Sequence, residues 1–452
     1  MTLCYEVYAL QTFNKTEFII MALGNIIGSG IFLASSLVIT VAGAWAPLAY
    51  LLGGLIMMME VAFLIEMSII DPAPGAFKVH AQEIFGNWWG FVVGWMFWTS
   101  GILGMASEVT ACAIFARLWS PATPLWMFSL LFSILITLIN LNDLKGLSKF
   151  ELSLASIKII ALSLFVLVGF AAVSGLAIGK ISPDFTLYTE ALTAPREGIL
   201  GLLASMLLIL FAYTGTGIIG IAATETEQAE KVVPPATRIV TLFIVALYTL
   251  VAFLITVLLP RSSLQPDTSP FVSLFELANI PYSGDVVNII LLTATLSALN
   301  SQVYSSSRML FSLAKNNQAP AFAAYQSRRG VPVAAVALSG FFLLGATLLS
   351  YLLPERVFIY TVSASGFLAL INWMSVSATH YFYRKKILAT APEKIKYQAP
   401  FFPYLPWLCF VTIFIAICSA VLYPDQMPGL YSGGIILLII GVVYFFLPKS
   451  SP

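Results

Sequence analysis

Stretches of about 20 apolar residues, long enough to cross a lipid bilayer, follow one another along almost the whole chain. In the hydrocarbon core of a membrane each backbone amide and carbonyl needs a partner within the protein, so such stretches must be helices. Of the 452 residues, 59% are hydrophobic and 10% are charged, which excludes an ordinary soluble protein. The sequence therefore predicts an all-α membrane protein without a separate soluble domain. The twelve predicted spans are roughly residues 16–42, 46–70, 88–117, 125–141, 151–176, 198–222, 238–260, 285–314, 332–352, 357–383, 402–423 and 430–447.

The basic residues are unevenly divided between the segments that join these spans. If the N-terminus is inside, the outer segments hold only Arg117, Lys180, Arg196, Arg261 and Arg356, and nearly all other Lys and Arg residues fall inside. The positive-inside rule therefore places both termini in the cytoplasm. The start of the chain lacks the basic region of a cleavable signal peptide, so we expect a multi-pass plasma-membrane protein. The short tails favour a bacterial inner membrane.

The first span is interrupted by Gly24-Asn-Ile-Ile-Gly-Ser-Gly-Ile-Phe32. Each glycine costs a helix about 1 kcal/mol relative to alanine, so this run predicts two half-helices with an unwound joint. The second half-helix would present the amides of Ser29, Gly30 and Ile31, and the positive end of its dipole, to a cavity that can hold a carboxylate.

A second interruption of the same kind occurs in the sixth span, at Tyr213-Thr-Gly-Thr-Gly-Ile-Ile219. It contains a literal G-x-G-x-x-G, Gly215 to Gly220, but no short strand precedes it and no acidic residue follows about 20 positions later, so a dinucleotide site is excluded. Matching breaks in the two halves of a membrane protein indicate the binding site of a secondary transporter.

Two ionisable residues fall deep within apolar spans, where a charge is expensive and faces the protein interior. Glu108 lies in the third span, either as a structural carboxylate that holds two helices together or as a proton-handling group. Lys158 lies about 12 Å into the fifth span by helical rise. It either fixes the first and fifth spans together or stands in the place of a bound cation by donating to carbonyls of an unwound helix.

Other polar residues are more ambiguous. Glu225, after the sixth span, is either a solvated loop residue or part of the site, and Ser301 in the eighth span either packs helices or lines the cavity. Glu60 in the second span has no predicted role. The last two spans carry almost no polar side chains, which favours a scaffold or the surface of a homo-oligomer.

The sequence indicates no cofactor. His80 and His380 lie far apart near span ends, without the spacing of a metal motif, so no metal site is expected. No Gly-Lys-Ser motif for ATP is present, no nucleophile–base pairing or nucleic-acid-binding pattern is visible, and none of the four cysteines falls in a predicted outer loop.

Several separated motifs, which extend from about residue 15 to 385, together resemble the amino acid permeases of the amino acid–polyamine–organocation superfamily, in its amino acid transporter branch. The segments that carry the resemblance are Ile27-Gly-Ser-Gly-Ile-Phe32, Glu66-Met, Pro74-Gly-Ala-Phe77, Glu108-Val-Thr-Ala111, Trp119-Ser-Pro121, Glu151 to Lys158, Ala222-Ala-Thr-Glu225, Pro234, Ser297-Ala-Leu-Asn-Ser301, Arg308-Met-Leu-Phe-Ser-Leu-Ala314 and Gly330-Val-Pro332.

The resemblance implies a LeuT-like fold, a five-plus-five inverted repeat with discontinuous helices 1 and 6 and two extra helices. The implied divisions are a cytoplasmic tail (1–15), the first repeat with helices 1–5 (16–176), the second repeat with helices 6–10 (198–383), helices 11 and 12 (402–447) and a second cytoplasmic tail (448–452).

It also implies where a substrate would bind. The substrate carboxylate would rest on the amides of Ser29 to Ile31, its amino group on carbonyls freed at both breaks, and Phe211 or Tyr213 would form an aromatic lid. Lys158 would contact first-helix carbonyls near Ile26 and the hydroxyl of Ser301. The implied substrate-binding residues are Ile27, Gly28, Ser29, Gly30, Ile31, Phe211, Tyr213, Thr214, Gly215 and Gly217, and the implied coupling residues are Lys158, Glu108, Ser301 and Glu225.

One departure from the pattern bears on specificity. Many members of this branch read Gly-Thr-Glu at the sixth-helix break, where this chain reads Gly215-Thr-Gly217. Without that carboxylate a cationic substrate has no obvious partner for its side chain, so a neutral amino acid is the expected substrate. We therefore expect a secondary transporter of neutral amino acids in lipid, most simply a proton symporter. An exchanger, or an amino acid sensor without net transport, is the alternative.

Overall fold

The computed structural model describes residues 15–72, 77–141, 147–176, 181–186, 188–189, 195–224, 226, 228–260, 263–264, 268–279, 281–327 and 330–446. Helices dominate these ranges, as the apolar runs predict. The helices discussed below are α1 (Lys15–Ile26), α2 (Ser29–Phe32), α3 (Ala34–Ala42), α4 (Ala46–Ile70), α5 (Phe77–Phe85), α6 (Asn87–Arg117), α7 (Leu125–Leu141), α8 (Leu147–Val173), α10 (Pro195–Ala212), η2 (Thr214–Thr216), α11 (Gly217–Thr224), α12 (Ala229–Leu258), α13 (Pro270–Leu277), α14 (Ser283–Lys315), α15 (Val333–Leu352), α16 (Val357–Thr390), α17 (Tyr404–Ser419) and α18 (Met427–Val443).

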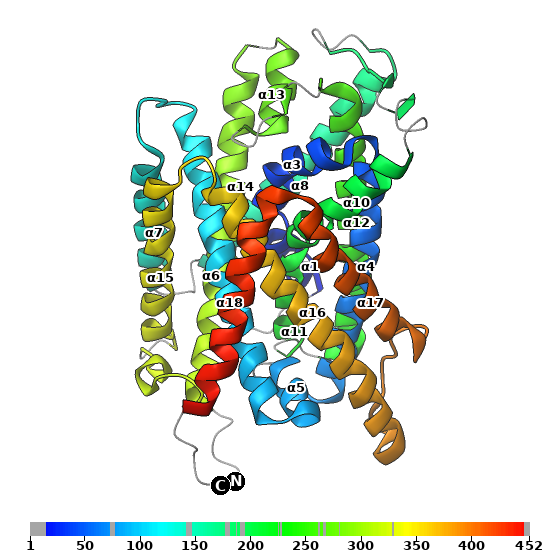
Figure 1. The fold of residues 1–452 in the computed structure, drawn as a ribbon, viewed down its shortest axis with the longest axis vertical. Coiled ribbons are helices and arrows are strands. Elements are labelled where there is room, and N and C mark those ends of the chain that lie inside the picture. Colours follow the sequence, from blue (N-terminus) through cyan, green and yellow to red (C-terminus); the bar gives the residue numbers. More distant parts are fainter. Residues whose placement is uncertain are drawn as a thin grey trace.

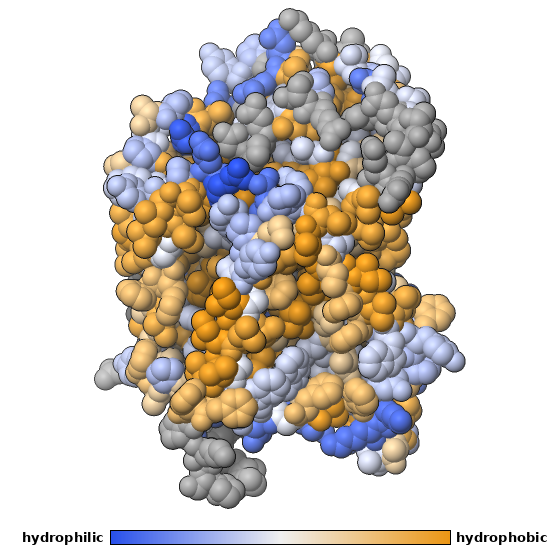
Figure 2. All heavy atoms as spheres, in the orientation of Figure 1, coloured by the Kyte–Doolittle hydropathy of each residue, from blue (hydrophilic) through white to orange (hydrophobic). Residues whose placement is uncertain are grey.

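Ten helical segments of the described chain are long and apolar enough to cross a membrane, and α7 is a shorter apolar helix. The long helices run along one direction, with α5 at one end of the molecule and α13 at the other (Figure 1). Apolar side chains form a band across the middle of the visible face, and hydrophilic side chains gather towards both ends (Figure 2). This distribution is that of a multi-pass membrane protein, while the count of twelve spans stays a prediction.

The helix bounds follow the apolar runs closely where no proline intervenes. The predicted spans 46–70 and 125–141 coincide with α4 and α7. The helix that contains the predicted span 238–260 begins before it, because α12 starts at Ala229 and carries Pro234 and Pro235 within it. Both prolines lie in the second turn of α12. Because proline has no amide hydrogen, the carbonyl four residues before each one lacks its helical donor. These carbonyls lie in the exposed first turn, where water can donate to them.

The two interrupted helices lie at the centre of this arrangement. α1 packs against α8, α12 and α14 and contacts η2, and α10 packs against α3, α4 and α16. α7 and α15 lie side by side at the edge of the molecule (Figure 1). The breaks are therefore enclosed by helices drawn from both halves of the chain. The repeat boundaries, the termini at 1–15 and 448–452, and an oligomer surface on α17 and α18 stay predictions.

Candidate functional site

The first break lies between α1 and α2, where Ile27 and Gly28 leave the helix and Gly28 adopts an extended backbone. The amide of Ser29, at the start of α2, donates to both carboxylate oxygens of Glu108 from α6, each at 3.1 Å. The Glu108 side chain is buried. The sequence predicted that this amide would face a substrate carboxylate, but in the structure a carboxylate of the protein itself occupies it.

Gly28 allows this approach because it has no side chain. A Cβ atom at this position would lie 2.6 Å from Glu108 Oε1 and 3.0 Å from the Cβ of Ala298. The amides of Ile31 and Phe32 are used within this short segment, since both donate to the Gly28 carbonyl, at 3.2 and 3.3 Å. Gly30 is buried between these residues.

Lys158 is fully buried on α8, and its amine contacts the backbone at the C-terminal end of α1, where the helix is interrupted. Its Nζ donates to the carbonyls of Gly24, at 2.6 Å, and Ile27, at 3.2 Å. The Tyr248 hydroxyl donates to the carbonyl of Ile26 at 3.1 Å. These carbonyls, which have left the helical hydrogen-bond ladder, are thus satisfied by protein donors, as a low-dielectric interior demands. Ser301 is buried on α14, and its predicted contact with Lys158 stays a prediction.

The second break is in direct contact with the first break. α10 ends at Ala212, and α11 begins at Gly217 after the short helix η2. Asn25 Nδ2, next to the end of α1, donates to the Gly215 carbonyl at 2.5 Å. A Cβ atom on Gly215 would lie 2.8 Å from the Asn25 carbonyl carbon and 2.9 Å from Ile26 Cα, so only glycine permits this contact. The two breaks form one unit.

Phe211 and Tyr213 are both buried before the second break. The Tyr213 hydroxyl donates to the Tyr50 carbonyl at 3.0 Å, and its ring lies 5.2 Å from that of Tyr248. Neither residue is among those that line the cavity described next, so a role as a lid stays a prediction.

A cavity of about 80 Å³ extends from the breaks towards the end of the molecule occupied by α5. Its described lining carries polar and apolar side chains but none with a charge. The lining residues are Asn25, Leu64, Phe77, Phe97, Ser100, Gly101, Gly104, Thr214, Gly215, Gly217, Gln302, Ser305, Ser306, Ser365, Ala369, Asn372, Trp373 and Val376. Two buried side-chain oxygens of this lining, Asn25 Oδ1 and Gln302 Oε1, have no hydrogen-bond partner in the described part of the chain. These two oxygens can accept hydrogen bonds from a bound ligand.

The opposite side of the breaks is closed by packing. The ring of Phe32 on α2 lies 5.5 Å from that of Phe271 on α13, which in turn lies 4.5 Å from Phe165 on α8. The hydroxyl of Ser269, just before α13, donates to the Phe32 carbonyl at 2.8 Å. The site therefore faces the α5 end and is shut towards the α13 end.

Broken helices around a central cavity are a transporter architecture, and a model of the family described as amino acid permease matches residues 17–450. The chain belongs to the amino acid permease family.

Curated relatives match this permease over nearly its whole length. Amino-acid permease RocC of Bacillus subtilis is 32% identical over 443 residues, which cover 96% of this chain and 94% of the relative. The gamma-aminobutyric acid permease of the same species is 34% identical over 438 residues, covering 97% and 93%. The aromatic amino acid transport protein AroP of Escherichia coli is 30% identical over 434 residues, covering 96% and 94%.

Among solved structures, that of MhsT in complex with L-phenylalanine is similar to this permease, with a TM-score of 0.60 at 18% identity. The match covers 91% of this chain and 99% of MhsT. The likeness establishes the LeuT-type fold, with its first and sixth spans interrupted as the sequence predicted.

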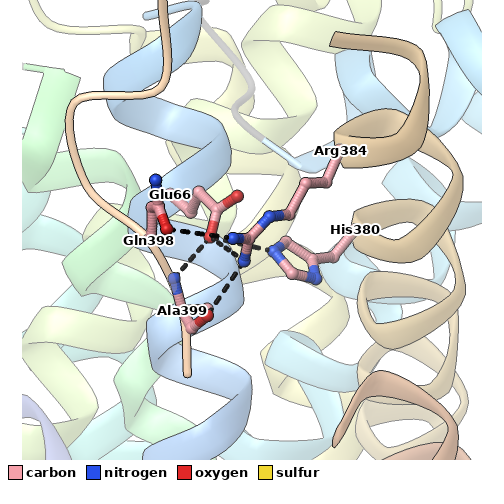
Figure 3. A network of polar contacts seen from close by, with 5 residues as sticks. All are labelled: Glu66, His380, Arg384, Gln398 and Ala399. Carbon is pink, nitrogen blue, oxygen red and sulfur yellow. Dashed lines mark hydrogen bonds and ion pairs between the residues drawn. The ribbon is translucent and has the colours of Figure 1, made fainter. Parts of the chain in front are cut away.

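A second polar site of the permease, which sequence reasoning missed, surrounds Glu66 on α4 (Figure 3). Glu66 Oε2 accepts from Arg384 Nη1 at 3.2 Å and from the Ala399 amide at 2.5 Å, and it lies 3.2 Å from His380 Nε2. Arg384 also donates to the carbonyl of Ala399 and to Gln398 Oε1. The partners are distant in sequence, so no local pattern could reveal the cluster.

Glu60, for which the sequence predicted no role, lies on the same helix. Its carboxylate accepts from the hydroxyl of Ser377 on α16, and both side chains are buried. Glu60 and Glu66 therefore both connect α4 to α16. Glu225, the remaining predicted coupling residue, lies outside the described residues.

Proposed function

We propose that this permease carries an amino acid with an uncharged side chain across the plasma membrane by alternating access. The observation that carries the proposal is the described cavity lining, which has no charged side chain and includes Gly217. Many members of the branch that the sequence resembles read glutamate at this position. A cationic or anionic side chain would lose its hydration there without gaining a counter-charge. The gamma-aminobutyric acid permease and AroP, named for substrates without a charged side chain, support the same reading.

The substrate's ammonium group would bind the unpartnered oxygens of Asn25 and Gln302. The carbonyls of Gly24, Ile26 and Ile27 are less available, because Lys158 and Tyr248 already donate to them. The substrate's carboxylate would take the amide of Ser29, at the positive end of α2.

Glu108 holds that amide in the present arrangement, so it competes with the substrate for the same donor. A protonated Glu108 loses its charge-assisted hydrogen bond and is more easily displaced. Substrate binding and proton binding would then favour each other, which is thermodynamic coupling between two sites. We therefore propose proton symport, with a bundle of spans 1, 2, 6 and 7 that moves against the remaining spans.

Uptake by purified protein in liposomes tests this function. Labelled phenylalanine, alanine, glutamine, gamma-aminobutyrate, arginine and glutamate are offered under an imposed pH gradient, with protein-free liposomes as the blank. We expect accumulation of at least one amino acid without a side-chain charge. Uptake restricted to arginine or glutamate would overturn the specificity, and uptake only into preloaded liposomes would replace symport by exchange. Thermal stabilisation by an amino acid without any uptake would instead identify a sensor.

Gly217→Glu is the matched variant for specificity. Gly217 lines the cavity, where a new Cβ would lie 3.2 Å from the edge of the Phe97 ring, a side chain that can turn aside. The added carboxylate should increase arginine uptake and reduce uptake of the neutral substrate. If the ratio of arginine uptake to uptake of the neutral substrate does not change, residue 217 does not determine which substrate charge the protein accepts.

Lys158→Ala tests the predicted cation role. Its loss leaves the Gly24 and Ile27 carbonyls without the amine, at a cost of about 1 to 3 kcal/mol for each unsatisfied group. We expect accumulation to be lost in sodium-free buffer. Partial recovery by Na⁺, but not by choline, would support the view that the amine takes a cation's place.

A further inference from the structure

A separate cluster of metal-ligating side chains lies where α4 meets α5, apart from the cavity. Asp71 is the first residue after α4, and His80 and Glu83 stand one turn apart on α5. One ligand atom from each of the three lies within 4.8 Å of the other two. Residues three apart on a helix share a face, which explains how His80 and Glu83 both point towards Asp71.

His80 shows that the cluster is more than a pair of surface carboxylates. The residue is fully buried, yet neither ring nitrogen has a hydrogen-bond partner in the described part of the chain. Its ring is held against that of Tyr383 on α16, with the centroids 4.9 Å apart. A buried imidazole without a partner calls for a ligand.

The two carboxylates can reach such a ligand at little cost. Asp71 and Glu83 are exposed, so both side chains can rotate without disturbing the core. Glu83 is engaged only with Lys386 of α16 among the described residues, at 2.7 Å, and both of these side chains are partly open to solvent. An ion pair of this kind contributes little to stability and yields to a divalent ion.

We propose that Asp71, His80 and Glu83 bind one divalent transition-metal ion of the zinc type. One imidazole nitrogen and two carboxylate oxygens are ligands that Zn²⁺ takes, with water in the fourth position. Zinc bonds of about 2.0 to 2.2 Å in a tetrahedral site place the ligand atoms about 3.3 to 3.6 Å apart. The two exposed carboxylates can rotate to reach this spacing from a separation of at most 4.8 Å.

A bound metal ion would change the side-chain contacts between α4, α5 and α16. Glu83 would leave Lys386 on α16 and share a metal with Asp71 at the end of α4. The metal would therefore add a link between α4 and α5 and remove the Glu83–Lys386 ion pair between α5 and α16, while His80 stays packed against Tyr383. If the proposed transport function holds, a bound metal ion would slow the relative movement of these helices, so this part of the inference rests on that function.

Titration of the purified full-length protein with Co²⁺ and Zn²⁺ tests the site without reference to transport. We expect one ion per chain and a visible Co²⁺ spectrum without the thiolate charge-transfer band that cysteine ligands give. Asp71→Asn and Glu83→Gln, at exposed positions, and His80→Gln should each weaken binding by about tenfold or more. Lys386→Met should tighten it, because Glu83 is freed, and Glu355→Gln, an exposed glutamate elsewhere, should leave it unchanged.

No binding, binding that His80→Gln leaves intact, or a thiolate band would each overturn the site. Uptake by liposomes with and without Zn²⁺ then tests its effect: the wild type should slow, and Asp71→Asn should not. Equal inhibition of both would refute the regulatory effect. A protein that binds metal but transports nothing would refute the proposed function and leave the metal site standing.

Discussion

The amide of Ser29 lies 3.1 Å from each carboxylate oxygen of Glu108. This pair joins the start of α2 to the last third of α6 at the point where a substrate carboxylate is expected. A group that can exchange a proton thus occupies the amide that we propose as the donor to the substrate carboxylate.

Glu108→Gln should separate binding from proton coupling. The glutamine oxygen still accepts from Ser29, but the side chain no longer changes charge, so a pH gradient should drive accumulation at least about fivefold less well. Exchange of labelled for unlabelled substrate, measured in preloaded liposomes without a gradient, should continue. Gradient-driven accumulation equal to that of the wild type would place the proton elsewhere.

Gly215→Ala should abolish most uptake and lower the melting temperature. The new Cβ would meet the backbone of Asn25 and Ile26, neither of which can rotate away as a side chain can. Gly345→Ala on α15 is the matched control, because a Cβ there meets no atom within 4 Å. We expect the control to melt no lower than the wild type in detergent. Two variants with the same stability would contradict the tight contact between the breaks.

Glu66→Gln should destabilise the protein by about 3 to 5 kcal/mol, since it leaves the buried guanidinium of Arg384 without its carboxylate. The double variant Glu66→Gln with Arg384→Met should recover part of this loss, because both charges are then removed. Thermal unfolding of the purified variants measures both. A double variant that melts below Glu66→Gln would show that Arg384 stabilises through its other contacts instead.

Lys78→Met should stabilise the protein at pH 7 by about 1 to 3 kcal/mol. Lys78 is buried on α5 and its amine has no hydrogen-bond partner among the described residues. Burial lowers its pKa from 10.5 to about 8. The unfolded chain therefore binds more protons between pH 8 and 10.5, and wild-type stability rises with pH across that window.

The advantage of Lys78→Met should accordingly shrink as the pH rises from 8 to 10.5. Thermal unfolding at pH 7, 9 and 10.5 measures it, with Lys385→Met at an exposed position as the control. An advantage that stays constant with pH would mean that packing, and not charge, limits stability at this position.

The fold was predictable because its signals are local. Apolar runs mark α4 and α7 to the residue, and glycine runs mark both breaks. The start of α12 was missed because Pro234 and Pro235 look like a helix boundary in sequence, although the second turn near the helix end tolerates them.

The site was only partly predictable, because its partners come together through packing. Lys158 was expected at first-helix carbonyls and lies at those of Gly24 and Ile27. In contrast, nothing in the sequence near Ser29 tells that Glu108 reaches its amide. His380 and Arg384 likewise carry no local sign that they meet Glu66.

The short helix α2 has a further consequence for how the protein opens. Its first residue is held by Glu108, and its last residue, Phe32, is held by Ser269, just before α13, and by the ring of Phe271 on α13. Only about one helical turn separates the two attachments. If a substrate displaces Glu108 from Ser29, as we propose, we expect the contacts of Phe32 one turn away to change with it, so that substrate binding at one end of α2 and opening of the packed side at the other would be coupled.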